Sequence, residues 1–125
     1  MNSTLRTVLL WLLAVLFIAG GLNHFRDPGF YLVMMPPLLP FPLELIYLSG
    51  VLEVLGGLLV LVPPLRRLIG WGLIALLVAV FPANIHAAVA QVQPPGGHVA
   101  PLLLWLRLPF QAVFIAWVYY AALYK

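Results

Sequence analysis

One glutamate in the middle of a long apolar stretch constrains this chain more than any other residue. Glu53 lies halfway along an apolar run over residues 45–62, and a membrane-spanning helix needs a run of roughly 20 residues. A carboxylate at that depth costs about 2.5–3.5 kcal/mol. Gly50, Glu53 and Gly57 share one helical face, because they are spaced at i, i+3 and i+7, and glycines let a neighbouring helix approach closely. We therefore expect Glu53 to point into packed protein and to need a partner there.

The composition indicates an integral membrane protein made of one small domain. Of the 125 residues, 65% are hydrophobic and 7% are charged, whereas soluble domains carry about 25% charged residues. The net charge of +3 is too small and too dispersed to indicate a nucleic-acid partner. Cysteine is absent, which excludes disulfides, intrachain thiol redox chemistry and Cys-ligated metal clusters. Residues 1–19 resemble a signal peptide, but the hydrophobicity of the remaining chain favours a retained signal-anchor.

Four apolar segments are each long enough to cross a membrane as a helix. They cover residues 5–24, 42–62, 68–91 and 101–124. Pro63 and Pro64 end the second segment, and Arg66 and Arg67 predict a tight turn before the third. The connection over residues 92–100 is rich in proline and glycine, which is typical of a loop. The predicted fold class is therefore all-α, a four-helix membrane bundle forming a single domain.

The connection between the first two spans is unusually apolar. Asp27 and Pro28 are typical of a helix N-cap and first turn, and they predict a short extra helix over residues 29–35. Apolar side chains continue as far as Phe41. We expect this outer loop to lie on the membrane surface or to fold back over the mouth of the bundle.

The basic residues predict the orientation of the chain in the membrane. One side of a four-span chain receives most of them, namely Arg6, Arg66, Arg67 and Lys125. Arg26 alone flanks a span on the other side. The positive-inside rule then places both termini in the cytoplasm, in an inner or plasma membrane.

A few polar side chains fall at similar depth in the outer part of the predicted spans. They are His24, Glu53, Asn84, Arg107 and Gln111. Counted from the helix ends at about 1.5 Å per residue, Arg107 lies about 10 Å and Glu53 about 18 Å below the outer end, a difference that an arginine side chain can cover. We predict an intramembrane ion pair between Glu53 and Arg107, with the other three satisfying the remaining donors and acceptors. The pair is either structural, fixing helix register, or part of a ligand site.

Two prolines inside the predicted spans lie next to these polar residues. Pro82 and Pro109 free the carbonyls of Val78 and Trp105 from helical hydrogen bonds. Kinks at these positions would open a cavity beneath the apolar loop. The pattern predicts a pocket for a small amphipathic molecule with a polar head and an apolar body.

The three histidines are weaker candidates for residues of such a site. His24 at the end of a span is suited to capping or hydrogen bonding. His86 lies about 200° around the helix from Asn84, so only one of them faces the core, and we expect Asn84. His98 is a loop residue without an assigned role. No spacing supports a haem or metal site, and we predict no metal.

Four motifs occur in an order and spacing that resemble a known family. They are AGGLNHF at residues 19–25, LSGVLEVLGG at 48–57, FPANIH at 81–86 and RLPFQ at 107–111. Together they resemble the DoxX-like family of small four-helix integral membrane proteins, over nearly the whole chain. The resemblance implies a four-helix membrane bundle. Relatives are tied to quinone-linked sulfur oxidation, to oxidative-stress complexes with partner enzymes and to assembly of other membrane proteins, and the family has no agreed catalytic residues to transfer.

Three functions remain open at this point. In a binding or accessory role, the pocket holds a lipid-like or quinone-like molecule or docks the helix of a partner membrane protein. In a quinone-linked oxidoreductase subunit, His24, Glu53 and Arg107 handle protons and a carbonyl head group. A small transporter is disfavoured by the single domain without a visible repeat pair. The sequence shows no nucleophile–base pair, metal motif or nucleotide loop, so it leaves catalysis open, with a quinone as the one cofactor class considered.

Overall fold

The computed structural model describes residues 2–93 and 99–124, and this part of the chain is helical without a strand. Four helical segments are long and apolar enough to cross a membrane. They are α1 (Ser3–Arg26), α3 (Pro42–Leu59), α4 (Arg66–Ala90) with the preceding 3₁₀ turn η1 (Pro63–Leu65), and α5 (Pro101–Val118), continued by the π-helical turn η2 (Tyr119–Leu123). The prediction of an all-α chain with four long apolar helices is confirmed, and the lengths indicate a multi-pass membrane protein.

The first helix is longer than predicted at both ends. Asn2 caps its N-terminus, because the Asn2 side chain accepts hydrogen bonds from the backbone N–H groups of Thr4 and Leu5 at 2.7 and 3.2 Å. At the other end the helix continues to Arg26. His24 is therefore part of the last turn of α1, and its side chain projects from the helix.

The turn between α3 and α4 also differs from the prediction. Helix α3 ends at Leu59, and η1 then forms the reversal with Pro63 at its first position. Arg66 and Arg67 consequently lie in the first turn of α4 and are not the turn itself. The predicted loop over residues 92–100 is only partly described, because residues 94–98 lie outside the described residues.

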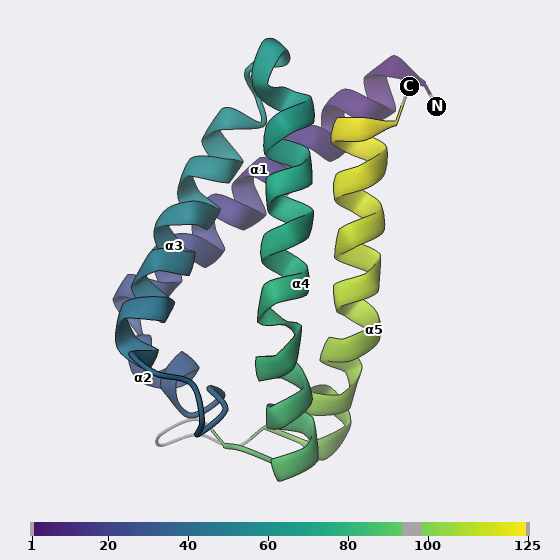
Figure 1. The fold of residues 1–125 in the computed structure, drawn as a ribbon. Helices are drawn as coiled ribbons and strands as arrows, with labels where there is room; N and C mark the ends of the chain where they lie inside the picture. The colour runs from purple at the N-terminus through teal and green to yellow at the C-terminus, as the bar shows by residue number, and fades with distance from the viewer. Residues whose placement is uncertain (1, 94–98, 125) are drawn as a thin grey trace.

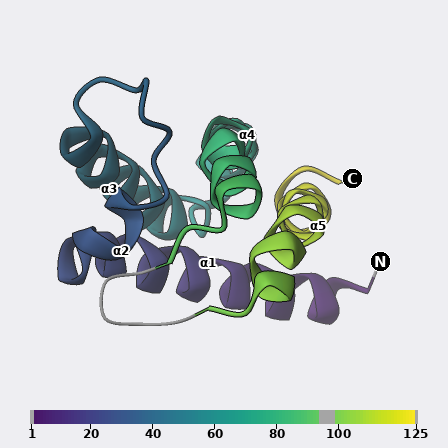
Figure 2. The same cartoon turned by 90° about the horizontal axis from the view of Figure 1, so that it is seen from below.

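Figure 1 shows both termini and η1 at one end of the molecule, which we call the terminal end. Helix α2 (Pro28–Leu32), the C-terminal end of α4 and the N-terminal end of α5 lie at the opposite end, the α2 end. Helix α1 packs against α3, and α4 packs against α5. Figure 2 shows α1 along the lower edge of the view, with α3, α4 and α5 all on its upper side.

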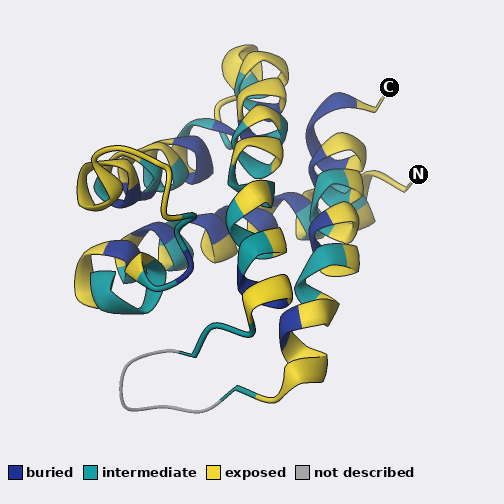
Figure 3. Cartoon of the chain, turned by 60° about the horizontal axis from the view of Figure 1, so that its bottom comes forward, coloured by how far each residue is buried: buried dark blue, intermediate teal, exposed yellow. Residues whose placement is uncertain are grey.

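Two clusters of buried side chains hold these helices together. The larger lies at the terminal end, where α1, α4, α5 and η2 meet around Leu13, Leu73 and Val118. The smaller joins the α2 end to α4 and α5 through Met34, Ala87, Ala88 and Leu104. Figure 3 shows exposed residues along the outward sides of the helices. Many of these are large apolar side chains, for example Leu12, Leu48, Val78 and Val113, which suits surfaces that contact lipid.

Three arginines close the terminal end by binding backbone carbonyls near helix C-termini. The Nε of Arg6 donates to the carbonyl of Ala121 at 3.1 Å, and Nη1 of Arg67 donates to that of Leu123 at 3.2 Å. Arg66 Nε donates to the carbonyl of Val60 at 2.9 Å. Carbonyls of a last helical turn have no intrahelical donor, so the guanidinium groups satisfy their hydrogen bonding. A positive charge there also interacts favourably with the negative end of the helix dipole.

Helices α1 and α3 approach so closely that side chains do not fit between them at three glycines. A Cβ atom added to Gly21 would lie 2.5 Å from the carbonyl oxygen of Gly50, and one added to Gly50 would lie 2.9 Å from that of Gly21. One added to Gly57 would lie 2.8 Å from the carbonyl oxygen of Ala14. The face of Gly50, Glu53 and Gly57 thus packs closely against a neighbouring helix, as its spacing predicted. That helix is α1, a neighbour that the spacing did not identify, and the packing brings Glu53 to it.

The short helix α2 covers fewer residues than the predicted 29–35. Asp27 occupies its N-cap position without a side-chain hydrogen bond, and Pro28 is its first residue. After Leu32 the chain continues in tight turns, in which the N–H groups of Met34 and Met35 bond to the carbonyls three residues earlier. Met34 is buried against α4 and α5. The loop therefore folds back over the α2 end of the helices, one of the two positions expected from the sequence.

Candidate functional site

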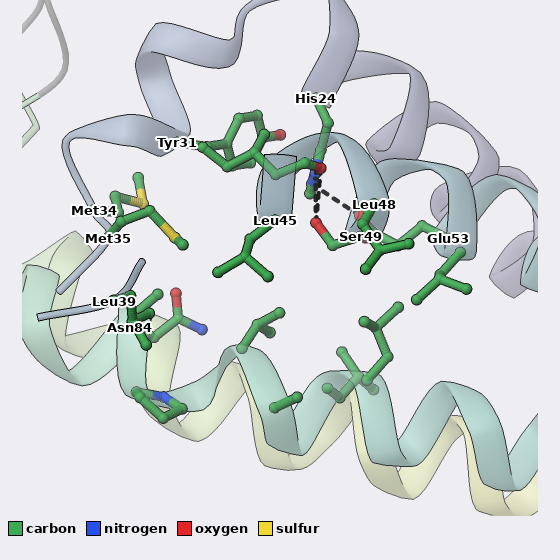
Figure 4. Close-up of a pocket in the computed structure, with 18 of the residues that line it drawn as sticks. His24, Tyr31, Met34, Met35, Leu39, Leu45, Leu48, Ser49, Glu53 and Asn84 are labelled. Atoms are coloured by element: carbon green, nitrogen blue, oxygen red, sulfur yellow. Dashed lines mark hydrogen bonds and ion pairs between the residues drawn. The ribbon is translucent and has the colours of Figure 1, made fainter. Parts of the chain in front are cut away.

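A cavity of about 730 Å³ lies between α1, α3, α4 and the loop that follows α2. This volume is within the usual range of small-molecule sites, roughly 300–1,000 Å³. Most of its walls are apolar side chains of α3, α4 and the loop. The polar lining residues are His24, Tyr31, Ser49, Glu53, Asn84 and Arg107. Figure 4 shows His24, Ser49 and Glu53 on the side of α1 and α3, with Asn84 across the cavity on α4.

Small residues explain why the helices leave this space open. Near the terminal end α3 and α4 are in direct contact, because Leu73 packs onto Gly56. Further toward the α2 end, α4 presents Ala79 and Ala83 to the cavity, and α1 presents Gly20. None of these side chains reaches across, so the gap remains unfilled.

His24 binds α3 through both of its ring nitrogens. Nδ1 lies 3.0 Å from the carbonyl oxygen of Ile46 and 3.0 Å from Oγ of Ser49, and Nε2 lies 2.8 Å from Oε2 of Glu53. Ser49 Oγ in turn donates to the carbonyl of Ile46 at 2.9 Å. Ile46, Ser49 and Glu53 can meet one imidazole because their spacing of i, i+3 and i+7 places them on one helical face.

The partners of His24 indicate which tautomer and which charge state of the pair with Glu53 they favour. A carbonyl oxygen only accepts hydrogen bonds, so the contact with Ile46 requires a proton on Nδ1. Nε2 and Oε2 then lie 2.8 Å apart, which is favourable only with a proton between them. The pair is either imidazolium with carboxylate or imidazole with carboxylic acid. Both forms have no net charge, which removes most of the cost of placing Glu53 inside a membrane span.

The carboxyl group of Glu53 depends on this one contact. Its Oε2 is buried and has no well-aligned hydrogen bond within the described part of the chain. The close approach of His24 Nε2 is the only polar contact recorded for that atom. Loss of the imidazole would leave the carboxyl group without compensation.

Tyr31 of α2 covers the outer side of His24. The two rings pack with centroids 4.1 Å apart, and the Tyr31 hydroxyl accepts a hydrogen bond from Asn23 Nδ2 at 2.8 Å. Asn23 Oδ1 accepts from Arg26 at 2.7 and 2.9 Å. Burial raises the pKa of the Tyr31 phenol above its ordinary value, so the hydroxyl stays protonated at physiological pH. Hydrogen bonds thus connect the exposed Arg26 to the edge of the cavity.

The predicted ion pair between Glu53 and Arg107 is wrong. Glu53 contacts His24, and Arg107 makes no salt bridge with any residue that the structure describes. Arg107 Nη1 instead lies 2.9 Å from Sδ of Met34, and its Cζ lies 5.3 Å from the centroid of the Phe30 ring. The reason is the packing of the helices: α3 lies against α1, whereas α5 lies against α4 and reaches the cavity from the far side.

Asn84 and Gln111 form a link between α4 and α5. Asn84 Nδ2 donates to Oε1 of Gln111 at 2.5 Å, and Gln111 Nε2 donates to the carbonyl of Leu77. Gln111 is buried and does not line the main cavity. Its role is to hold Asn84 in place. The carbonyl of Leu77 is adjacent to that of Val78, which lacks its helical donor because residue 82 is proline.

Of the five predicted site residues, His24, Glu53, Asn84 and Arg107 thus line one cavity, and Gln111 supports it. His86 does not line it, and His98 lies outside the described residues. Ser49 was missed, although its position four residues before Glu53 indicates the same helical face. The apolar loop that contains Tyr31 and Met34 was expected over the cavity, but the individual contacts of these two residues had no periodic signal, because both belong to the connection around α2. Within residues 2–93 and 99–124, no group of three potential metal ligands converges.

Four apolar helices and a cavity with apolar walls and a few polar groups define a small multi-pass membrane protein with a candidate ligand site. The chain belongs to the family described as a domain of unknown function, DUF8561, whose model matches residues 13–122. No curated protein and no solved structure matches it.

Proposed function

We propose that this protein binds one amphipathic molecule from the membrane, lipid-like or quinone-like, in the cavity between α1, α3 and α4. The observation that supports this proposal is the lining of the cavity, in which a few polar groups lie within otherwise apolar walls. Such a site suits a ligand with one polar head and an apolar body. The head would lie among His24, Tyr31, Asn84 and Arg107.

The apolar walls also offer a route by which such a molecule could enter. Leu48 and Leu52 of α3 line the cavity and are 54% and 45% exposed. Exposed apolar residues along a cavity wall would allow a membrane-dissolved molecule to enter sideways, between α3 and α4. The ligand then need not pass through water.

The proposal includes the arrangement expected from the DoxX-like resemblance. In it, the four helices form a membrane-spanning bundle, α2 lies on the outer side, and both termini are cytoplasmic in an inner or plasma membrane. Three arginines at the terminal end, Arg6, Arg66 and Arg67, support this orientation by the positive-inside rule.

A reporter enzyme that is active only outside the cytoplasm tests this orientation. Fused to the C-terminus, alkaline phosphatase should show background activity, whereas a reporter that fluoresces only in the cytoplasm should be bright at the same position. Strong phosphatase activity with a dark fluorescent fusion would reverse the orientation.

Filling the cavity tests the binding proposal. Ala83→Phe should place an aromatic ring in the cavity, because Ala83 lines it. Ala75 is exposed on the same helix and does not line the cavity, so Ala75→Phe is a matched control. Molecules extracted from the purified proteins are identified by mass spectrometry. We expect one class of amphipathic molecule with the wild type and with Ala75→Phe, and its loss from Ala83→Phe. Equal recovery from all three proteins would contradict the proposal.

A second candidate is a subunit of a quinone-linked oxidoreductase. The specific observation in its favour is the contact of 2.8 Å between His24 Nε2 and Glu53 Oε2 at the cavity wall. Two ionisable groups this close can pass a proton, and reduction of a quinone consumes protons as well as electrons. The electrons would have to come from a partner enzyme. A bound quinone whose reduction by such a partner fails in Glu53→Gln would support this candidate, and a co-purifying membrane protein without any small ligand would instead favour an accessory role.

A further inference from the structure

Arg107 brings a positive charge to the cavity, and no counterion for it lies among residues 2–93 and 99–124. Its guanidinium is held by the thioether of Met34, at 2.9 Å, and by the aromatic face of Phe30, at 5.3 Å from Cζ to the ring centroid. A thioether is a weak acceptor and an aromatic face carries only a partial negative potential, so neither neutralises the cation. No carboxylate in the described part of the chain lies within salt-bridge distance of it.

The side chain of Arg107 also does not extend along the helix toward water. A long basic side chain near a helix end normally extends its charged head toward water. Arg107 instead turns under the loop after α2, where its contact Met34 is buried, and it lines the cavity. The packing thus holds the charge at the cavity and not at the outer surface.

The other ionisable groups of the cavity do not offset this charge. The pair of His24 and Glu53 is neutral as a unit when Nδ1 carries the proton that the carbonyl of Ile46 accepts and a second proton is shared by Nε2 and Oε2. Tyr31 keeps its proton, since burial raises the pKa of its phenol. Asn84 carries no charge. The lining of the cavity is therefore positive, with the charge concentrated at Arg107.

We propose that the ligand carries an oxyanion, a phosphate or a carboxylate, which binds Arg107 while its apolar tail lies along α3 and α4. This inference rests on the proposed function and specifies the ligand class for the same site. An unpaired cation inside a membrane span is costly, and an anionic head removes that cost. The planar guanidinium also matches the two oxygens of a phosphate or carboxylate. A neutral quinone or diglyceride would leave the charge unpaired.

The test compares anionic with neutral probes on the full-length protein. The protein is placed in nanodiscs of dioleoylphosphatidylcholine, and dioleoylphosphatidic acid, oleate and dioleoylglycerol are added one at a time. Bound probe is counted by native mass spectrometry. The wild type should bind at least one anionic probe about tenfold to a hundredfold more tightly than dioleoylglycerol, the range expected of a hydrogen-bonded charge. Arg107→Gln should abolish that preference.

Arg67→Gln is the control, because Arg67 is an exposed basic residue at the terminal end that does not line the cavity or contact a residue that does. It should retain the preference for the anionic probe. A stronger binding of phosphatidic acid than of oleate identifies a phosphate head, and the reverse identifies a carboxylate.

Two outcomes would overturn the inference, and they differ in what else they overturn. Equal binding of dioleoylglycerol and both anions by the wild type, still blocked by Ala83→Phe, removes the charge preference and leaves the proposed cavity intact. Absence of any bound molecule, including phosphatidylcholine, would contradict both the preference for an anion and the proposed binding function. If Arg107→Gln fails to fold, the relative binding of anionic and neutral probes by the wild type still tests whether the site prefers an anion.

Discussion

Replacing His24 by leucine should destabilise the protein by about 3–5 kcal/mol, the usual cost of removing one partner of a buried ion pair. The change removes His24 Nε2, the one polar atom in contact with the buried Oε2 of Glu53 among the residues that the structure describes. Adding Glu53→Leu should restore much of the loss, because two apolar side chains replace the pair without leaving a polar group unpaired. The measurement is the free energy of unfolding of both proteins in detergent, together with Glu53→Leu alone.

Arg107 supplies the control for this double-mutant cycle. Because Glu53 and Arg107 do not touch, the losses caused by Glu53→Leu and Arg107→Leu should add to within about 0.5 kcal/mol, as for independent sites. Strong coupling between Glu53 and Arg107, with additivity between Glu53 and His24, would show that the pairing in solution is the one first expected from sequence depth.

Gly21→Ala should destabilise the protein although alanine is the better helix former. A Cβ at this position would lie 2.5 Å from the carbonyl oxygen of Gly50 and 2.9 Å from the backbone nitrogen of Val54. Both are backbone atoms, so α1 and α3 must separate. Overpacking of this kind costs about 1–3 kcal/mol or more, which exceeds the gain of about 1 kcal/mol from replacing a helical glycine.

Gly72→Ala is the matched control, since nothing lies within 4 Å of a Cβ added there. The same chemical change should therefore stabilise α4 slightly. Thermal unfolding in detergent compares the two variants, and the melting temperature should fall for Gly21→Ala and stay equal or rise for Gly72→Ala. Equal shifts for both would mean that α1 and α3 are not in close contact.

The sequence predicted that Glu53 needs a partner, because the free-energy cost of a carboxylate within an apolar span is removed only by a polar or charged neighbour. The face that it shares with Gly50 and Gly57 was also predictable from spacing. The identity of the partner was not. Depth along the spans admitted both His24 and Arg107, and depth carries no information on which helix lies beside α3. The glycines of α1, including Gly21, held that information, because close approach requires small residues on both helices.

The surroundings of Arg107 show a second limit of sequence reasoning. Its contact with Met34 joins residues 73 positions apart, and Met34 belongs to a turn without helical periodicity. A flexible thioether in an irregular loop leaves no pattern from which its position can be derived. The apolar character of the loop predicted that it would lie on the membrane surface or fold back over the mouth of the bundle, but not that it would contact Arg107 at the cavity.

The central claim is that the cavity binds an amphipathic molecule. A crystal structure, determined from crystals grown in a lipid mesophase, tests it most directly. The account predicts an elongated density in the cavity between α1, α3 and α4, with one end near Arg107 and with His24 Nε2 against Glu53 Oε2. Helices α3 and α4 packed together along their length, with no space at Ala79 and Ala83, would contradict it.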